Sequence, residues 1–441
     1  MEHCPAPSFP ISFIPRVSSF SAPMILVLLT TALSVGFMLL SPLPSSAQTI
    51  DQSSTPLPTQ APSSGQPSAP PASPTFTFGG QVSLLSSARV DTAFEPFFSL
   101  RAIPELKFSF ALGRSTRPSL GVTIDAEASV NAYGSLLLSR DRAADASGDI
   151  KPYRAWLRLS TARFEARAGL QKVSFGSAVL FRPMMWFDSL DPRDPLQLTD
   201  GVYALLLRYY TEGNANFWAW AMAGNDDRRG FDLAPPDKKT PEFGGRVQVP
   251  LFKGEIGATY HHRKAAIDGL APIMDPVSPL PVGPVPEDRF GVDGKWDIGV
   301  GVWLEGALVH QWTPLLPLPY QMALAAGLDY TIGLGNGLNV LLEHFRLESS
   351  ARAFAAGNSR SFSAMLARYP LGLLDELSAI FYFDWRSDRL YSFLSWKRTS
   401  DAFSFSAILF RNPRDLPVFP GNPGSSSFAG TGFQLLLAYY F

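Results

Sequence analysis

Residues 433–441 of the chain read FQLLLAYYF, and their side chains alternate strictly between two faces. Successive side chains of a β-strand point to opposite faces, so a period of two residues predicts a strand. One face of this strand carries Phe433, Leu435, Leu437, Tyr439 and Phe441. Such a segment suits the last strand of either a soluble β-sandwich or a membrane barrel, and the rest of the chain has to separate these two architectures.

The amino end carries the features of a secretory signal peptide. An apolar run, Met24 to Leu40, follows Arg16 and precedes the small residues Ser45, Ser46 and Ala47. A signal peptidase reads this order of charge, apolar stretch and small residues. We therefore expect cleavage after Ala47, which removes residues 1–47. An uncleaved membrane helix is the alternative, because the run approaches the about 20 apolar residues that span a bilayer.

Residues 48–75 consist mainly of Pro, Ser, Thr, Gln and Ala, with almost no aliphatic side chains. Such a segment cannot bury enough apolar surface to fold, so it is predicted to be a disordered Pro/Ser-rich tether on the periplasmic side. The single cysteine, Cys4, precedes the apolar run, so a mature chain has no disulfide. The cysteine that a lipoprotein carries just after this run is also missing.

Residues 76–441 are long enough for one large barrel, and they contain no apolar stretch that could form a membrane helix. The whole chain is 46% hydrophobic, 12% aromatic and 17% charged, with 35 glycines and 39 prolines, a composition that suits many strands separated by turns. Its net charge of −1 gives no basic field for a nucleic acid, so we expect no DNA or RNA partner.

About eighteen segments of roughly ten residues show a period of two, the length that crosses a bilayer at a tilt. The clearest are residues 123–131, 163–171 and 289–297, each with apolar side chains on one face and polar side chains on the other. Residues 217–223 and 337–347 have blurred alternation, which leaves sixteen strands as the alternative count. In a membrane barrel this alternation places lipid outside and water inside.

The connectors between these segments run short and long in turn. Short connectors lie near residues 160–162, 250–253, 297–299, 333–337 and 399–401, and long connectors near residues 139–150, 174–200, 224–242, 262–288, 347–360 and 411–427. Short turns at one rim and long loops at the other are typical of an up-and-down membrane barrel. Greek-key sandwiches have no reason to keep this parity. The fold predicted is therefore an all-β, transmembrane, antiparallel up-and-down barrel.

The inward face of such a barrel would carry charges of both signs. The cationic positions are Arg154, Arg158, Arg163, Arg167, Arg208, Arg246 and Lys253, and the acidic positions are Asp125, Glu127, Asp293, Asp297, Glu305 and Asp329. If strands follow one another around the wall, an arginine-rich arc lies across from an acidic arc and creates a transverse field over the pore. The alternative is that the arginines pair with neighbouring acids and fill the interior.

The long connector after the fifth predicted strand reads GLQKVSFGSAVLFRPMMWFDSLDPRDP at residues 169–195. It combines an apolar middle with three carboxylates, Asp188, Asp191 and Asp194. In position and acidic content it resembles the loop that Gram-negative outer-membrane porins fold into the barrel, where its acids face an arginine wall and set the constriction. The Arg167, Gly169, Gln171 and Gly176 pattern also resembles porin-like families. An external lid is the alternative, because long loops often fold outward.

The resemblance implies an outer-membrane porin that passes small polar or anionic solutes by diffusion, and it allows a homotrimer. It also implies that the strand at residues 433–441, which ends on an aromatic residue, is the signal that the barrel assembly machinery reads. The pore-lining residues expected to matter most are Arg154, Arg158, Arg163, Arg167 and Arg208, with Asp188, Asp191 and Asp194 facing them. Membrane lipid and small solutes are the expected partners.

Enzymatic chemistry is not predicted. His261 and His262 are adjacent on a predicted strand and therefore point to opposite faces, which makes them a poor metal chelate, while His310 and His344 are isolated. No nucleophile elbow, phosphate loop or zinc-protease motif is present, so no cofactor and no metal site are expected. A plugged structural or adhesive barrel, which binds a partner through long loops such as residues 262–288, is the alternative function. An outer-membrane barrel enzyme is a second, less favoured alternative.

Overall fold

The computed structural model of the protein describes residues 74–91, 95–112, 121–138, 144–267, 283–414 and 428–441. The predicted signal peptide and nearly all of the predicted tether lie outside the described residues. Among the residues that the structure describes, no helix is long and apolar enough to cross a membrane.

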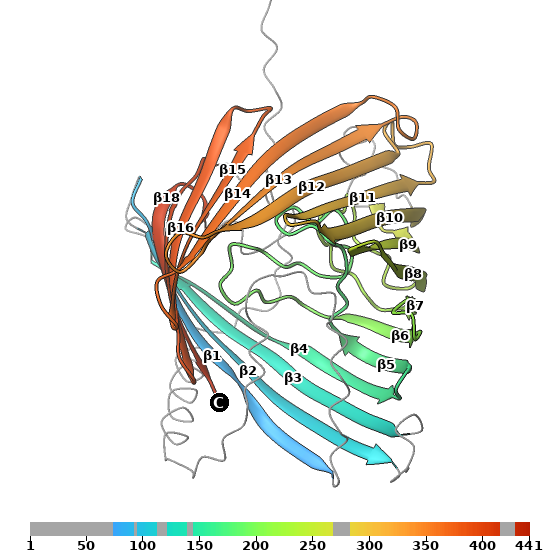
Figure 1. The fold of residues 1–441 in the computed structure, drawn as a ribbon, viewed down its shortest axis with the longest axis horizontal. Helices are drawn as coiled ribbons and strands as arrows, with labels where there is room; N and C mark the ends of the chain where they lie inside the picture. Colours follow the sequence, from blue (N-terminus) through green and yellow to red (C-terminus); the bar gives the residue numbers. More distant parts are fainter. Residues whose placement is uncertain (1–73, 92–94, 113–120, 139–143, 268–282, 415–427) are drawn as a thin grey trace, which may run out of the picture.

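Eighteen antiparallel strands follow one another around a closed barrel (Figure 1). Their bounds are β1 Thr75–Arg89, β2 Glu95–Leu112, β3 Val122–Leu137, β4 Asp145–Ser160, β5 Phe164–Gln171, β6 Val202–Tyr210, β7 Asn216–Met222, β8 Glu242–Leu251, β9 Gly254–Ala265, β10 Val285–Asp297, β11 Gly301–Gln311, β12 Tyr320–Ile332, β13 Leu338–Ser350, β14 Asn358–Pro370, β15 Asp375–Asp384, β16 Arg389–Thr399, β17 Phe403–Arg411 and β18 Thr431–Tyr440. Each strand pairs with its neighbours in sequence, and β18 pairs with β1 to close the ring. The predicted fold and the count of eighteen are confirmed.

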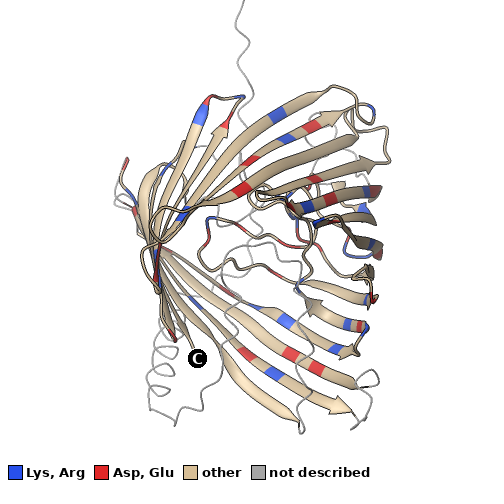
Figure 2. Cartoon of the chain, viewed as in Figure 1, with Lys and Arg blue, Asp and Glu red and all other residues tan. Residues whose placement is uncertain are grey.

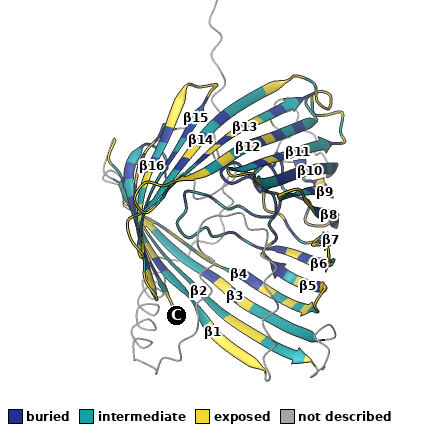
Figure 3. Cartoon of the chain, in the orientation of Figure 1, coloured by how far each residue is buried: buried dark blue, intermediate teal, exposed yellow. Residues whose placement is uncertain are grey.

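The period of two places apolar side chains outside and polar side chains inside. On β11, Leu304 is 58% exposed, whereas its neighbour Glu305 is 2% exposed and faces the interior. Bands of exposed and buried residues alternate along single strands in Figure 3. An outer face of exposed Leu, Val, Phe and Tyr side chains, on a closed sheet with no free edge, fits a lipid environment. The barrel is therefore a membrane-spanning barrel of the outer-membrane type.

Two strands with blurred alternation are regular members of the wall. The inward side chains of β7 include Trp218, Trp220 and Met222, all buried, and those of β13 include Leu341 and Phe345. These inner faces carry large apolar side chains because they pack against protein rather than against water, and Glu343 is the buried charged residue on the inner face of β13. This packing explains why the sequence pattern left sixteen strands as an alternative.

Two connectors are shorter than expected. The predicted loop at residues 347–360 is reduced to residues 351–357, because β13 continues to Ser350 and β14 begins at Asn358. The predicted loop at residues 139–150 is strand from Asp145 onward, because the β3 and β4 hairpin continues in register from Leu137 paired with Asp145. Most of the long connectors predicted at residues 262–288 and 411–427 lies outside the described residues.

Candidate functional site

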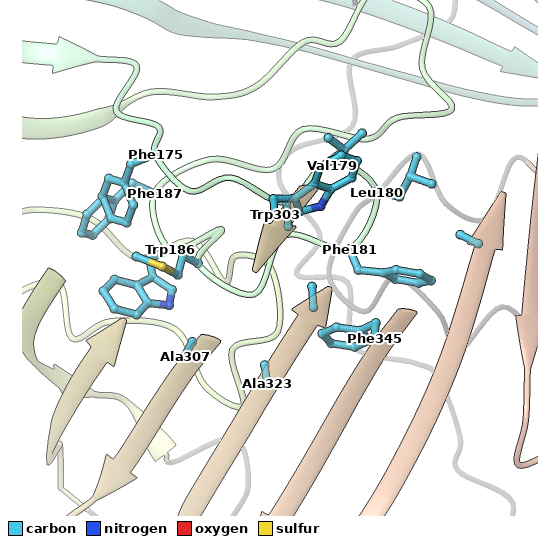
Figure 4. Packing of buried hydrophobic residues seen from close by; sticks show 14 of the residues in the cluster. Phe175, Val179, Leu180, Phe181, Trp186, Phe187, Trp303, Ala307, Ala323 and Phe345 are labelled. Carbon is cyan, nitrogen blue, oxygen red and sulfur yellow. The ribbon is translucent and has the colours of Figure 1, made fainter. Parts of the chain in front are cut away.

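The segment between β5 and β6, residues 172–201, folds into the barrel (Figure 1). We call it the inner loop. Its side chains Val179, Leu180 and Phe181 are at most 5% exposed, and they pack against the barrel wall (Figure 4). The Phe181 ring stacks on Phe345 of β13, with centroids 5.1 Å apart. The external-lid alternative is therefore wrong, and the apolar middle of the sequence is the reason: it would be exposed to water on an outward loop.

Carboxylates of the wall hold the backbone of this loop. Glu343 of β13 accepts hydrogen bonds from the amides of Val179, Leu180 and Phe181 at 2.9, 3.1 and 2.6 Å. It also accepts one from Trp303 Nε1 at 2.9 Å. Because the loop has no ladder partner for these amides, the buried carboxylate supplies the acceptors that they need.

Two more wall acids extend this attachment. Glu305 of β11 accepts from the amides of Ala178 and Met184 at 2.8 and 2.6 Å, and Asp293 of β10 accepts from the hydroxyl of Ser177 at 2.9 Å. Glu305 and Asp293 are thus inward-facing, at positions where the alternation predicted acidic side chains. In the structure they bind the inner loop rather than stand free in the lumen.

The acids of the inner loop do not face the arginines of the wall. Asp188 pairs with Arg182 of the same loop, with an Nη2 to Oδ2 distance of 2.9 Å, and Asp191 pairs with Arg193 at 2.6 Å. Asp194 accepts hydrogen bonds from backbone amides of the loop, at 3.0 Å from Leu196. The expectation of a free acidic constriction is corrected, because arginines within the loop neutralise Asp188 and Asp191.

In the buried pair of Arg182 and Asp188, the charge of the arginine keeps the aspartate ionised. Burial opposes ionisation of the Asp188 carboxyl, but the charge and hydrogen bonds of Arg182 outweigh burial and hold the pKa of Asp188 below its usual value. Asp188 is therefore a carboxylate at neutral pH, and the loop is cross-linked by charge across six residues.

Arginines of β4, β5 and β6 lie side by side on the wall opposite the anchored end of the inner loop. Arg158 pairs with Asp125 at 2.8 Å, and Arg167 and Arg208 approach Glu165 at 2.9 and 3.9 Å. The ion pairs of these three arginines involve two carboxylates, Asp125 and Glu165, and the charge of Glu127 on β3 also acts on Arg167. We call Arg158, Arg167 and Arg208 the arginine patch.

Arg154 has a different role from the one predicted. It is 8% exposed and donates to the carbonyl oxygens of Tyr153 and Thr199, at 2.6 and 2.9 Å. Since Thr199 belongs to the returning end of the inner loop, Arg154 ties that end to β4 instead of lining open water.

Three further predicted wall residues lie at the rim with the short turns. Arg163 and Lys253 belong to turns, and Arg163 pairs with Glu212 of the next turn. Asp297 ends β10, is exposed, and accepts from the amide of Gly299 in the following turn. For Arg163 and Lys253 the alternation was extended one or two residues too far, because the period of two does not show where a strand stops.

The predicted separation into an arginine arc and an opposing acidic arc is wrong. Arg158 and Asp125 lie directly across from each other on neighbouring strands, and Arg246 of β8 pairs with Asp293 of β10 at 2.5 Å. Figure 2 shows positive and negative residues interspersed along adjacent strands. Glu127 and Asp329 lie on the strands where they were predicted, β3 and β12. The charges are therefore compensated locally, which is the alternative that the sequence left open.

A second connector, between β7 and β8, also turns inward, which we did not predict from the sequence. Asp232, in the connector between β7 and β8, is 6% exposed and pairs with Arg263 at 3.0 Å and with Arg289 at 2.8 Å. Both arginines also bond Glu287 of β10. Arg263, Glu287 and Arg289 all occupy inward positions near the long-loop ends of β9 and β10, and this local concentration of charge was the available signal.

The second connector holds the first. Arg229 is 5% exposed and donates to the carbonyl oxygens of Phe187 and Gly201, at 3.1 and 2.9 Å, both in the inner loop. The two inward connectors therefore form one hydrogen-bonded body inside the barrel.

The adjacent histidines point to opposite faces, as predicted. His261 is buried and lies 3.1 Å from Glu242, whereas His262 is on the outer face, 2.7 Å from Asp288. Among the described residues, no group of three or more His, Cys, Asp or Glu side chains could hold a metal ion.

The residues at 433–441 close the barrel. Leu435 and Leu437 of β18 are exposed on the outer face, and Phe441 exchanges backbone hydrogen bonds with Gly80 of β1 at 3.0 and 3.1 Å. Its ring lies 5.6 Å from that of Phe78. The face that carries Phe433, Leu435, Leu437 and Tyr439 is thus the lipid-facing side of β18.

Comparison with known proteins gives a likeness of structure. No protein-family model and no curated protein sequence matches the chain. OccK5 (OpdH) of Pseudomonas aeruginosa matches with a TM-score of 0.50 and 11% identity over 83% of this chain and 97% of that chain. OccK7 (OpdD) of Pseudomonas aeruginosa matches at 0.48 and 9%, over 83% of this chain and 99% of that chain. An anion-selective porin from Comamonas acidovorans matches at 0.44 and 11%, over 83% and 100%. With its closed wall of eighteen strands and its inner loop, the chain has the fold of the Gram-negative outer-membrane porins.

Proposed function

We propose that the protein is a porin that lets small polar solutes, anions among them, diffuse passively across the outer membrane. The observation that carries this proposal is the closed wall with apolar residues outside and polar residues inside, combined with a loop that folds inward between β5 and β6. Eighteen strands enclose more space than side chains of the wall alone can fill. The protein has no enzymatic role in this proposal.

The arginine patch supports a preference for anions. Together with Arg154, these residues make four arginines against three carboxylates, Asp125, Glu127 and Glu165, so this part of the wall carries one more positive than negative charge. Fixed charges at a narrow, water-filled path attract counter-ions and repel ions of the same sign. Because most other charges are paired locally, the preference is expected to be modest.

The test is conductance in planar lipid bilayers, with the reversal potential measured across a KCl gradient. Discrete open steps and a reversal potential of anion sign are expected. The triple variant R158A/R167A/R208A leaves Asp125 and Glu165 without their partners, so its reversal potential should shift toward cations. R163A is the matched control, because Arg163 lies in an exposed turn and pairs with Glu212. Equal shifts in both variants would contradict the role of the patch.

A plugged structural or adhesive barrel is the second candidate. The two inward connectors bond each other and the wall through hydrogen bonds and ion pairs, and this attachment favours a plug. Protein that is folded in the bilayer but carries no current would support this candidate and contradict the porin.

We make three further proposals: cleavage after Ala47, recognition of β18 by the barrel assembly machinery, and assembly as a homotrimer. The first rests on the sequence of the amino end, and the other two rest on the porin fold. The mass of the mature protein tests the cleavage site. Insertion of a variant that lacks Phe441 tests the recognition of β18, and light scattering of the detergent-solubilised protein tests the homotrimer.

A further inference from the structure

The rim with the short turns, which faces the periplasm, carries a row of exposed apolar side chains. Four turns contribute to it: residues 252–253 between β8 and β9, 298–300 between β10 and β11, 333–337 between β12 and β13, and 371–374 between β14 and β15. These strands are neighbours in the wall, so the row is continuous along one part of the rim. We call it the apolar crest, and its members are Phe252, Ile298, Leu334, Leu371 and Leu373.

The exposure of the apolar crest is high even for residues in turns. Phe252 is 94% exposed, Ile298 66%, Leu334 60% and Leu371 52%, and Leu373 is fully exposed. Single exposed apolar residues are normal on a protein surface, but a contiguous row of them marks a surface that contacts something apolar.

Other described turns of the same rim are polar. Residues 161–163 read TAR, residues 211–215 read TEGNA and residues 400–402 read SDA. The turn between β2 and β3 lies mostly outside the described residues. The apolar crest is therefore not a general property of the short turns of this barrel, and the polar turns show what the same geometry carries where it meets water.

The backbone of Phe252 gives independent evidence that this surface makes a contact. Its φ angle is 56°, in the left-handed region that a bulky side chain rarely adopts and that glycine or asparagine adopts more easily. The ring is almost wholly exposed, so packing within the chain does not compensate this strain. A strained residue of this kind points to a function of its side chain outside the barrel.

The apolar crest continues the lipid-facing wall without a break. On β12 and in the turn after it, Leu328, Tyr330, Ile332 and Leu334 follow one another at every second position, and each is between 42% and 60% exposed. Aromatic residues near strand ends mark the depth of the lipid headgroups, and Tyr330 has this place on β12. Leu334 lies four residues beyond it toward the periplasm. The surface that lipid covers on the strand therefore extends into the turn.

We propose that the apolar crest is inserted in the periplasmic leaflet of the membrane, with its side chains among the phospholipid chains next to the headgroups. Lys253, which is exposed beside Phe252, then meets the lipid phosphates. Apolar side chains with a neighbouring cation are typical of segments that bind at this depth. Continuity with the lipid-facing wall identifies the partner as a phospholipid surface. The inference concerns the seating of the barrel in the membrane, and it holds whether or not the barrel conducts.

Fluorescence quenching tests the insertion. Cys4 is the only cysteine of the chain, so a C4S background accepts one bimane label at L373C, in the apolar crest, or at E212C, in the polar turn between β6 and β7. Each protein is reconstituted in phosphatidylcholine vesicles, with brominated phosphatidylcholine as the lipid quencher and iodide on both sides as the aqueous quencher. Brominated lipid should remove roughly half of the emission at residue 373 and little at residue 212, and iodide should do the reverse.

Two results would overturn the proposal. Equal quenching of both labels by iodide would place the apolar crest in water. Protection of residue 373 from both quenchers would show that protein, in these vesicles a second copy of the chain, covers the apolar crest in place of lipid.

A second experiment needs no label. The variant F252N/L373N removes two members of the apolar crest, and asparagine suits the left-handed backbone at position 252, so the barrel should fold and should melt in detergent as the wild type does. In vesicles, the acyl-chain length that gives the highest melting temperature should be shorter for the variant by about two carbons, because less apolar surface has to be covered.

E212N/S400N is the matched control, with two substitutions in polar turns of the same rim. Its optimal chain length should equal that of the wild type. An unchanged optimum in F252N/L373N, or an equal shift in E212N/S400N, would overturn the insertion. Conductance in KCl is recorded separately, so a silent barrel whose label at residue 373 is quenched by lipid would contradict the porin and keep the apolar crest.

Discussion

The attachment of the inner loop to Glu343 can be tested by the variant E343Q. One oxygen of Glu343 accepts from the amides of Leu180 and Phe181, and the other accepts from the amide of Val179 and from Trp303 Nε1. Glutamine has nearly the same shape, but it replaces one of these oxygens by an NH₂ group. Two of the four donors then face another donor.

The cost follows from these contacts. A buried donor that loses its acceptor costs about 1 to 3 kcal/mol, so two donors give roughly 2 to 6 kcal/mol. Water from the lumen can replace part of the loss, and we therefore expect a value near the lower limit, about 2 kcal/mol. At 1.4 kcal/mol for each factor of ten, this corresponds to an opening equilibrium of the loop that is about thirtyfold more favourable.

Hydrogen exchange measures this opening directly, because a protected amide exchanges at a rate set by the free energy of local opening. The amides of Val179, Leu180 and Phe181, which bond Glu343, should exchange about thirtyfold faster in E343Q, while the amides of the strands keep their protection. Current recordings should show more noise in the open channel, since the loop leaves its position more often.

The matched control is E348Q. Glu348 is a buried carboxylate on the same strand, β13, and it bonds Arg346 and the amide of Gly357 rather than the inner loop. If the amides of Val179, Leu180 and Phe181 exchange at the wild-type rate in E343Q, or accelerate equally in E348Q, the reasoning that Glu343 anchors the loop is refuted.

Three other variants address the same assembly. F181A removes a ring that packs in a closed apolar cluster. Such a change costs about 3 to 5 kcal/mol in a rigid core. In the same exchange experiment, the protection of the loop amides should therefore fall at least as far as in E343Q. R229Q removes the hydrogen bonds between the two inward connectors and should raise channel noise without lowering the melting temperature of the barrel in circular dichroism. For Asp188, whose pKa is lowered in the folded protein, the pair with Arg182 contributes fully above the ordinary carboxyl pKa of about 3.9 and is lost as the pH falls through the lowered value. Conductance should therefore show no pH dependence from this pair between pH 7 and 5, and D188N should abolish the acid-dependent change below that range.

The strands of the wall were predicted well from the sequence, because a barrel strand can be recognised from the pattern of its own residues. Side chains two residues apart share a face, and lipid on one side and polar contacts on the other force an alternation that can be read along ten residues. The segments at residues 123–131 and 289–297 lie within β3 and β10, and the pattern at 163–171 matches β5 from its second residue. The parity of short and long connectors follows from the same geometry.

The alternation of apolar and polar side chains was weakest where the inner face of the wall packs against protein instead of water. β7 and β13 carry Trp220 and Phe345 on their inner faces, because the inner loop covers them. Strand ends were also uncertain, and Arg163 and Lys253 therefore fell in turns. A period of two says which side chains share a face, but it says nothing about the residue at which the ladder ends.

The sequence by itself determined a membrane barrel with an unusual connector after its fifth strand, because these properties depend on neighbours along the chain. Only the tertiary structure decided which charges meet. Glu343 and Val179 are 164 residues apart, and Arg246 and Asp293 are 47 apart. The partner of a buried charge depends on closure of the ring and on the path of the loop within it, and these are contacts between distant residues that no local period records.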